Sequence, residues 1–275
     1  MDTNNYCELV IDADDEAVRE ELIARLADIG YDGFEETGSL LKAYIPDTYF
    51  IENDINKIFS NYNLTYSKSI IKKQNWNKLW ESNFEPVQIE DFVGIRADFH
   101  PSFKDVMHEM VITPKMSFGT GHHATTYMVI QLMRDLNFTA KAVFDFGTGT
   151  GILAILAEKL GASKVLAVDN DSWCIENASE NILINECKNI EIQLVTEFSI
   201  MEKFDIILAN INKNVILESI YLLNEGLISG GQLLLSGILK EDEIDILAAS
   251  SSLGLHHRST LERNGWIAIW LNRKS

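Results

Sequence analysis

The stretch VFDFGTGTG at residues 143–151 decides the fold of this 275-residue chain. An apolar run ends in three glycines at alternate positions, and apolar residues recur at helical spacing over residues 153–160. The pattern predicts a strand, a glycine turn and a helix, which form one nucleotide-binding half of a doubly wound α/β sheet. Glycines let the backbone of such a turn approach a ligand that lies on the helix N-terminus.

Two carboxylates narrow the kind of ligand that this turn would hold. Asp169 ends the next apolar strand, 22 residues after Gly147, where it can bind ribose hydroxyls of a dinucleotide or of S-adenosylmethionine. Asp145 would repel a diphosphate and attract the ammonium and sulfonium groups of S-adenosylmethionine. The pattern favours S-adenosylmethionine, with a dinucleotide site and a purely structural turn as alternatives. The expected cofactor-binding residues here are Asp145, Gly147, Gly149, Gly151 and Asp169.

Two further segments carry candidate site residues. A loop rich in glycine and small hydroxyls, residues 116–126, precedes an amphipathic helix and could cover the cofactor. Thr126 in this loop either hydrogen-bonds the bound molecule or caps the helix. The apolar strand 204–209 ends at Asn210, which should face the transferred methyl group, because parallel sheets bind ligands at their carboxyl ends. A helix-capping turn is the competing interpretation of Asn210. No metal site is expected, since the adjacent His122 and His123 diverge and lack partners at ligand spacing.

The rest of the chain suggests two domains and a connection. Residues 1–70 follow the order β-α-β-β-α-β, which predicts a small α+β domain of the ferredoxin-like type, and domains of this type often bind partners. Residues 71–85 are expected to form a linker helix, and residues 86–275 the cofactor-binding domain. In that domain Asn264-Gly265 separates two strand-like runs and predicts an antiparallel hairpin at the end of the sheet. Such a hairpin fits Rossmann-like (class I) methyltransferases and not the usual dehydrogenases.

Composition limits the partners and the compartment. The formal net charge is −18, and residues 1–60 hold 15 acidic side chains against four basic ones. This charge argues against nucleic-acid binding and favours either a basic partner or a simple solvated surface. Neither a signal sequence nor a membrane-spanning apolar stretch is evident, and the three cysteines lack disulfide or zinc spacing. We therefore expect a cytoplasmic protein that acts as a monomer and does not bind a membrane. Its cysteines are expected to be small buried side chains.

Taken together, these residues resemble the ribosomal-protein methyltransferases of the PrmA type, which modify the eleventh protein of the large ribosomal subunit. The resemblance spans almost the whole chain. It implies that Thr126, Gly147, Asp169 and Asn210 contact S-adenosylmethionine. The chain departs from the usual family pattern at His122, Ala124 and the 148–150 segment. The motifs that carry the resemblance are Asn75-Trp76, Trp80 and Phe84, the loop 118–121 with His123 and Thr125-Thr126, Asp145-Phe146-Gly147, Ala209-Asn210-Ile211 and the segment 235–239.

The resemblance also implies the reaction. Family members methylate lysine side chains and the N-terminal amine of the ribosomal protein, and a neutral amine is required as the nucleophile. Asn210, or the carbonyls beside it, would accept hydrogen bonds from that amine, and no general base is assigned. Two alternatives stay open: a methyltransferase that acts on another protein or a small-molecule amine, and a non-catalytic S-adenosylmethionine-binding module.

Overall fold

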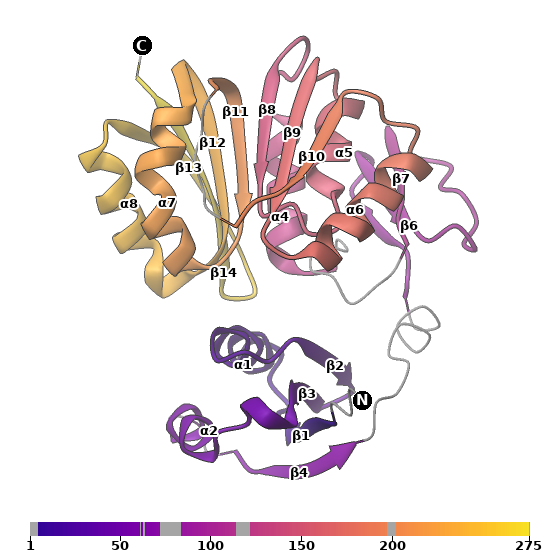
Figure 1. The fold of residues 1–275 in the computed structure, drawn as a ribbon, viewed down its shortest axis with the longest axis vertical. Coiled ribbons are helices and arrows are strands. Elements are labelled where there is room, and N and C mark those ends of the chain that lie inside the picture. Colours follow the sequence, from indigo (N-terminus) through magenta and orange to yellow (C-terminus); the bar gives the residue numbers. More distant parts are fainter. Residues whose placement is uncertain are drawn as a thin grey trace. The chain divides into compact units, whose positions relative to one another are not determined.

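The computed structural model describes residues 5–60, 62, 64–71, 84–113, 122–196 and 202–274. The chain divides into two compact units, Met1–Lys78 and Leu79–Ser275 (Figure 1). Residues 72–83 of the predicted linker helix (71–85) and residues 116–121 of the predicted loop (116–126) lie outside the described residues.

The N-terminal unit contains the predicted order of strands and helices. Its four-stranded antiparallel sheet has the strand order β2-β3-β1-β4. Alternate side chains of β1 and β3, such as Leu9 and Leu41, are fully buried and pack with Leu22 and Leu26 of α1. The elements are β1 (Tyr6–Asp12), α1 (Glu16–Asp28), β2 (Gly33–Thr37), β3 (Leu40–Pro46), the short 3-10 helix η1 (Asp47–Tyr49), α2 (Glu52–Phe59) and β4 (Tyr66–Ile71).

Asp15 is the N-cap of α1 and accepts a hydrogen bond from the backbone N–H of Ala17 at 2.9 Å. Asp14, which precedes it, is equally suited to this position by residue type. Neighbouring aspartates are equivalent as capping residues, so only the extended backbone of Asp15 distinguishes them.

The C-terminal unit is built on a seven-stranded mixed sheet with the order β10-β9-β8-β11-β12-β14-β13. The first five strands in this order run parallel, and β14 runs antiparallel to both of its neighbours. This arrangement confirms the predicted doubly wound sheet with a C-terminal antiparallel hairpin. Asn264 and Gly265 form the hairpin turn with φ values of 53° and 79°. The elements are α4 (Ala124–Arg134), β8 (Ala142–Phe146), α5 (Ile152–Lys159), β9 (Lys164–Asp169), α6 (Ser172–Ile184), β10 (Ile190–Leu194), β11 (Phe204–Asn210), α7 (Lys213–Gly226), β12 (Leu227–Leu239), the 3-10 helix η2 (Lys240–Asp242), α8 (Glu243–Ser252), β13 (Leu255–Arg263) and β14 (Trp266–Arg273).

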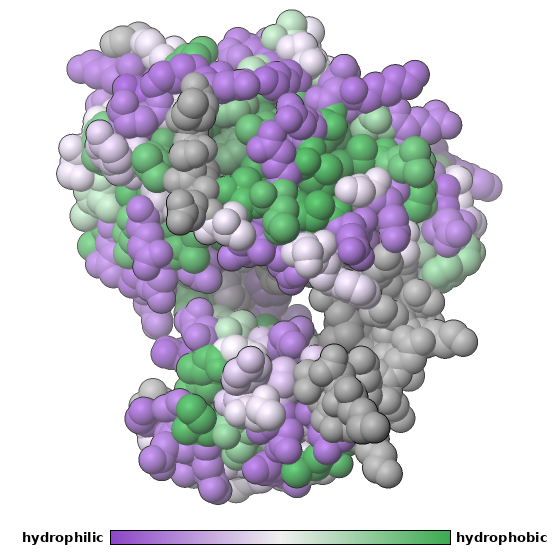
Figure 2. All heavy atoms as spheres, viewed as in Figure 1, coloured by the Kyte–Doolittle hydropathy of each residue, from purple (hydrophilic) through white to green (hydrophobic). Residues whose placement is uncertain are grey.

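Helices cover both faces of this sheet. On one face α7 and α8 pack over a core that includes Ile207, Ile220 and Ile246, while α4 and α5 lie against the opposite face (Figure 1). On α8, Ile246 is fully buried in this core, whereas Ile244 is 78% exposed. Figure 2 shows hydrophobic residues gathered in a band across the side of this unit that is seen in Figure 1. The strand order reverses between β8 and β11, which places a ligand site at their carboxyl ends.

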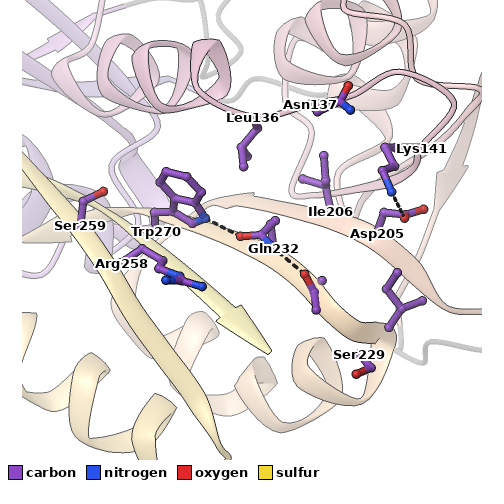
Figure 3. A pocket seen from close by; sticks show the side chains of 13 residues that line it. Leu136, Asn137, Lys141, Asp205, Ile206, Ser229, Gln232, Arg258, Ser259 and Trp270 are labelled. Carbon is purple, nitrogen blue, oxygen red and sulfur yellow. Dashed lines mark hydrogen bonds and ion pairs between the residues drawn. The ribbon is translucent and has the colours of Figure 1, made fainter. Parts of the chain in front are cut away.

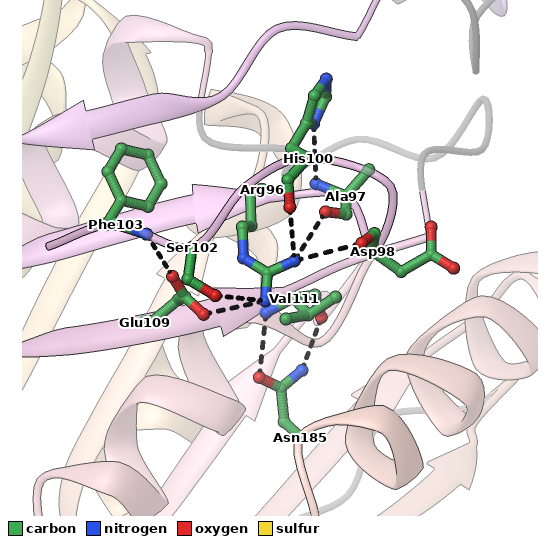
Figure 4. A network of polar contacts seen from close by, with 9 residues as sticks. All are labelled: Arg96, Ala97, Asp98, His100, Ser102, Phe103, Glu109, Val111 and Asn185. Atoms are coloured by element: carbon green, nitrogen blue, oxygen red, sulfur yellow. Dashed lines mark hydrogen bonds and ion pairs between the residues drawn. The ribbon is translucent and has the colours of Figure 1, made fainter.

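A separate three-stranded sheet precedes α4. It consists of β5 (Val87–Ile89), β6 (Val93–Arg96) and β7 (His108–Val111), of which β6 and β7 are parallel. The sequence predicts β6 and β7 but not the short β5. Arg96 holds the connection between β6 and β7, because its guanidinium donates to the carbonyls of Ala97 and His100 and pairs with Glu109 at 3.0 Å (Figure 4).

The cysteines and the apolar helices bear on the expectations drawn from composition. Cys7 is buried as expected, whereas Cys174 and Cys187 are only partly buried, so the expectation of three buried cysteines is wrong for two of them. Among the helices in the described ranges, none is both long and apolar enough to cross a membrane.

Candidate cofactor and acceptor site

The glycine turn after β8 has a backbone that only glycine adopts without strain. Gly147, Gly149 and Gly151 have φ values of 76°, 55° and 79°, in the left-handed region. A Cβ atom on Gly147 would lie 2.3 Å from Cγ2 of Ile211, which follows β11. The turn is held by the N–H group of Gly147, which donates to the carbonyl of Val168 at 2.9 Å. Conformation therefore favours glycine at all three predicted positions, and close packing requires it at Gly147 as well.

Asp169 lies at the end of β9 and contacts the turn directly. Its carboxylate accepts hydrogen bonds from the backbone N–H groups of Gly149 at 2.9 Å and of Asp171 at 3.1 Å. Asp171 caps α6 by accepting from the N–H of Trp173 at 2.8 Å, as the sequence predicts. These bonds fix the orientation of the Asp169 carboxylate beside the turn. Its contact with ribose stays a prediction.

Asp145 is a buried carboxyl group with one unused oxygen. It is 1% exposed, and its Oδ2 accepts from the hydroxyl of Thr148 at 2.6 Å. Its Oδ1 is buried and makes no hydrogen bond of normal geometry within the described structure. Burial raises the pKa of Asp145 to about 7, the charge of Asp169 adds to the rise, and the Thr148 hydroxyl opposes it. A cation placed against this carboxyl would favour its ionised form.

Asn210 at the end of β11 is joined to Thr126 on α4, although 84 residues separate them in sequence. The amide Nδ2 of Asn210 donates to Oγ1 of Thr126 at 3.1 Å, and both side chains are buried. The carbonyl Oδ1 of Asn210 is buried without a hydrogen-bond partner among the described residues. The competing capping interpretations are wrong: Asn212 caps α7, and His123 caps α4. Asn210 therefore presents an unused acceptor oxygen.

Two residues that are not among the predicted site residues, His123 and Trp266, lie near this end of the sheet. The rings of His123 and Trp266 meet edge to face, with centroids 4.7 Å apart. Burial lowers the pKa of His123 to about 4, so this histidine is neutral at pH 7. Trp266 is 6% exposed, and its Nε1 has no hydrogen-bond partner in the described part of the chain. The sequence could have indicated Trp266 as a site residue, because it directly follows the Asn264-Gly265 turn. It therefore begins a strand at the edge of the sheet where Asn210 lies.

The seven predicted site residues gather at one edge of the sheet. Asp145, Asp169 and the glycines surround the turn between β8 and α5, and Gly147 packs on Ile211, the neighbour of Asn210. The site thus combines two buried acceptor oxygens, Oδ1 of Asp145 and Oδ1 of Asn210, that have no hydrogen-bond partner of normal geometry among the described residues, with a backbone open to close approach. This donor-poor arrangement fits the cationic groups of S-adenosylmethionine, and it does not fit a diphosphate.

A different hollow lies at the opposite end of the strands. It has a volume of about 660 Å³, and its walls include the start of β11 and the outer part of β14 (Figure 3). Four of its polar side chains form two pairs: Lys141 with Asp205 at 2.8 Å, and the Trp270 indole N–H with Gln232 at 2.7 Å. These pairs indicate a structural role for those four side chains.

Within the described ranges, no group of three or more His, Cys, Asp or Glu side chains is arranged to hold a metal ion. His122 packs its ring edge to face against Phe84, with centroids 4.9 Å apart. His123 accepts a hydrogen bond from the N–H of Thr125 as the cap of α4. The two histidines thus have packing and capping roles.

Comparison with known proteins identifies the family. The family model described as ribosomal protein L11 methyltransferase (PrmA) matches residues 9–274. The chain belongs to this family. The match covers both units, so the PrmA relationship extends beyond the cofactor-binding sheet.

Individual relatives support the assignment of the chain to the PrmA family. A ribosomal protein L11 methyltransferase of Porphyromonas gingivalis is 41% identical over 256 residues, covering 90% of this chain and 88% of the relative. One of Phocaeicola vulgatus is 35% identical, covering 92% of this chain and 93% of the relative. The crystal structure of a ribosomal protein L11 methylase from Lactobacillus delbrueckii subsp. bulgaricus aligns with a TM-score of 0.64 and 30% identity, over 70% of this chain and 100% of that one.

Proposed function

We propose that this chain transfers methyl groups from S-adenosylmethionine to ribosomal protein L11, at lysine side chains and the N-terminal amine. Membership of the PrmA family supports the reaction and its substrate. The observation that carries the chemistry is the buried, unpartnered Oδ1 of Asn210 beside the glycine turn. An acceptor oxygen at this place can receive an N–H group of an incoming amine.

The cofactor would be held by residues around the turn. Asp169 would bind the ribose hydroxyls, Asp145 would face a positive group, and the glycines would allow the backbone to lie against the ligand. Thr126 would act from α4, where its hydroxyl already contacts Asn210. When bound, S-adenosylmethionine supplies an electrophilic methyl group on a sulfonium ion.

The protein's part in the transfer is to position the acceptor. Asn210 would accept a hydrogen bond from the amine through Oδ1, while its bond to Thr126 fixes the amide orientation. The amine must be neutral, and a partly desolvated site lowers the pKa of a lysine from about 10.4. His123, with a pKa of about 4, is too weak a base to remove the proton at pH 7. In this proposal water would take the proton, and no dedicated general base is assigned.

The N-terminal unit is proposed to recognise the basic ribosomal protein. All four of its Arg and Lys side chains within residues 1–60 pair with carboxylates, in the ion pairs Arg19–Glu36, Arg25–Glu21, Lys42–Glu35 and Lys57–Asp54. Because residues 1–60 hold 15 acidic side chains, most carboxylates there are not balanced by a basic neighbour. A negative surface of this kind attracts a basic protein and disfavours nucleic acid.

The proposed layout follows from the same reasoning. Residues 1–70 form the recognition domain, 71–85 the linker and 86–275 the catalytic domain of a monomer that acts in the cytoplasm. The order of strands and helices and the strand order β2-β3-β1-β4 support a ferredoxin-like recognition domain.

Mass spectrometry of purified ribosomal protein L11, after incubation with the enzyme and S-adenosylmethionine, tests this function. Added mass in units of one methyl group on lysines and the N-terminal amine is the expected result. Free lysine and an unrelated basic protein serve as controls for acceptor specificity. Methylation of the controls but not of L11 would assign the enzyme to another acceptor, and no transfer to any acceptor despite cofactor binding would indicate a binding module.

A variant that lacks residues 1–70 tests the recognition role. Cofactor affinity should stay within about twofold of the full chain, since every proposed cofactor contact lies in the other unit. Methylation of L11 should fall below detection. Equal activity of the truncated and full chains would contradict a recognition role for this domain.

A further inference from the structure

A buried asparagine on α6 links the glycine turn to the separate sheet. Asn181 is fully buried, and its Nδ2 donates to the backbone carbonyl of Thr150 at 2.8 Å. Thr150 lies between Gly149 and Gly151, in the middle of the turn. The Oδ1 of the same side chain accepts from the backbone N–H of Thr113, just after β7, at 2.8 Å. One amide group therefore connects two backbone segments that are far apart in sequence.

Both N–H groups and the carbonyl oxygen of this amide make hydrogen bonds. Its second N–H group points to Oδ1 of Asn177, one helical turn earlier, at 3.3 Å. A reversed amide would place a carbonyl oxygen against the Thr150 carbonyl and an NH₂ group against the Thr113 N–H. The donors and acceptors thus permit one orientation, and a buried amide that bonds in this way to two backbone segments rigidifies the groups that it joins.

The segment that Asn181 holds at its other end is itself anchored. One turn further along α6, Asn185 accepts from the N–H of Val111 at 3.1 Å and donates to the Val111 carbonyl at 2.6 Å (Figure 4). Arg96 and Glu109 brace β6 against β7, and the Glu109 carboxylate also accepts from the N–H of Phe103 at 2.6 Å. Because these bonds hold the end of β7 in place, Asn181 can anchor the glycine turn to it.

We propose that Asn181 is a positioning residue for the cofactor-binding turn. It holds the Thr150 carbonyl in place, and thereby keeps the flanking glycines in the left-handed conformation that a bound cofactor requires. A turn of three alternating glycines loses much backbone freedom when it becomes ordered, so an external tether lowers the entropy cost of binding. This inference rests on the proposed function, because the ligand is taken to be S-adenosylmethionine.

The test uses the full chain and compares three substitutions. Asn181→Leu keeps the size of the side chain and removes every hydrogen bond of the amide. Asn181→Asp keeps an acceptor for the Thr113 N–H but replaces the donor to Thr150 by a carboxylate oxygen. Asn224→Leu is the matched control: Asn224 is also buried on a helix and donates to a backbone carbonyl, that of Leu253, at 3.2 Å in a region remote from the turn.

The dissociation constants of S-adenosylmethionine and S-adenosylhomocysteine are measured by calorimetry, alongside the thermal midpoint of each variant. Both Asn181 variants should bind each ligand at least tenfold more weakly than the wild type, while Asn224→Leu stays within twofold at a similar loss of thermal stability. In kinetics, KM for the cofactor should rise in Asn181→Asp, with kcat at saturating cofactor within twofold of wild type.

Affinity losses that track thermal stability equally in all three variants would overturn the inference, and so would unchanged affinity in the Asn181 variants. Both results leave the proposed function intact, provided that the wild type binds the cofactor. A wild-type chain that binds neither ligand would overturn the proposed function together with this inference.

Discussion

Replacing Asp145 by asparagine is expected to stabilise the catalytic unit while weakening cofactor binding. Asparagine has nearly the same shape and can still bond to the Thr148 hydroxyl, which lies 2.6 Å from the Asp145 carboxyl. It cannot ionise, so the buried position no longer carries the cost of a charge. The same change removes the negative charge that would face a cationic group of the cofactor.

The size of the stability effect follows from the pKa. The folded protein raises the pKa of Asp145 from 3.8 to about 7, so the native state holds this proton more tightly than the unfolded chain does. Wild-type stability therefore falls as pH rises from about 4 to about 7, by about 1.4 kcal/mol per pH unit, and then levels off. The stability of Asp145→Asn does not fall with pH in this way, because asparagine does not ionise. Its stability advantage should grow by about 2 kcal/mol from about pH 5.5 to about pH 7, which corresponds to roughly 4–8 °C in Tm.

Scanning calorimetry of cofactor-free wild type and Asp145→Asn at three pH values, near 5.5, 7 and 8.5, measures this effect. The lowest value stays above the sequence pI of about 4.7. The Tm difference should increase between the first two conditions and stay constant between the last two. A Tm difference that is the same at all three would refute the assignment of a raised pKa. By calorimetric titration near pH 8, the variant should bind S-adenosylmethionine at least tenfold more weakly.

Three other substitutions test the remaining contacts of the site. Thr126→Val should lower kcat about tenfold, because Asn210 loses its orienting bond, and should also weaken cofactor binding, because the proposed contact of the hydroxyl with the cofactor is lost. Thr126→Ser should retain activity and affinity, and equal losses in both variants would argue against these roles. Gly147→Ala should abolish cofactor binding, because the added Cβ would collide with Ile211. Gly265→Ala is the control: Gly265 has a similar φ but no atom near its Cβ, so the substitution should cost only about 1 kcal/mol of stability. Comparable effects of the two substitutions on cofactor binding would contradict the close-approach argument. Asp169→Ala should raise the dissociation constant of S-adenosylmethionine, and an unchanged constant would refute the ribose assignment.

Local patterns were sufficient for most of the fold. The alternate glycines at 147–151 predict the turn, because positive φ values are a property of the residues themselves. Asn264-Gly265 predicts the hairpin for the same reason. Local patterns are insufficient where two neighbours are chemically equivalent, as with Asp14 and Asp15, or where burial depends on distant elements, as with Ile244 and Ile246 of α8.

Position at the end of a strand also predicts that Asp145, Asp169 and Asn210 share one edge of the sheet, because parallel strands present their carboxyl ends together. Only the tertiary structure decided what those side chains do there. The bond from Asn210 to Thr126 spans 84 residues. The raised pKa of Asp145 arises from burial by the whole unit, and Asn181 meets Thr150 and Thr113 only after α6 has packed. Hydrogen-bond partners and desolvation depend on which distant groups arrive beside a side chain, and the local sequence does not contain that information.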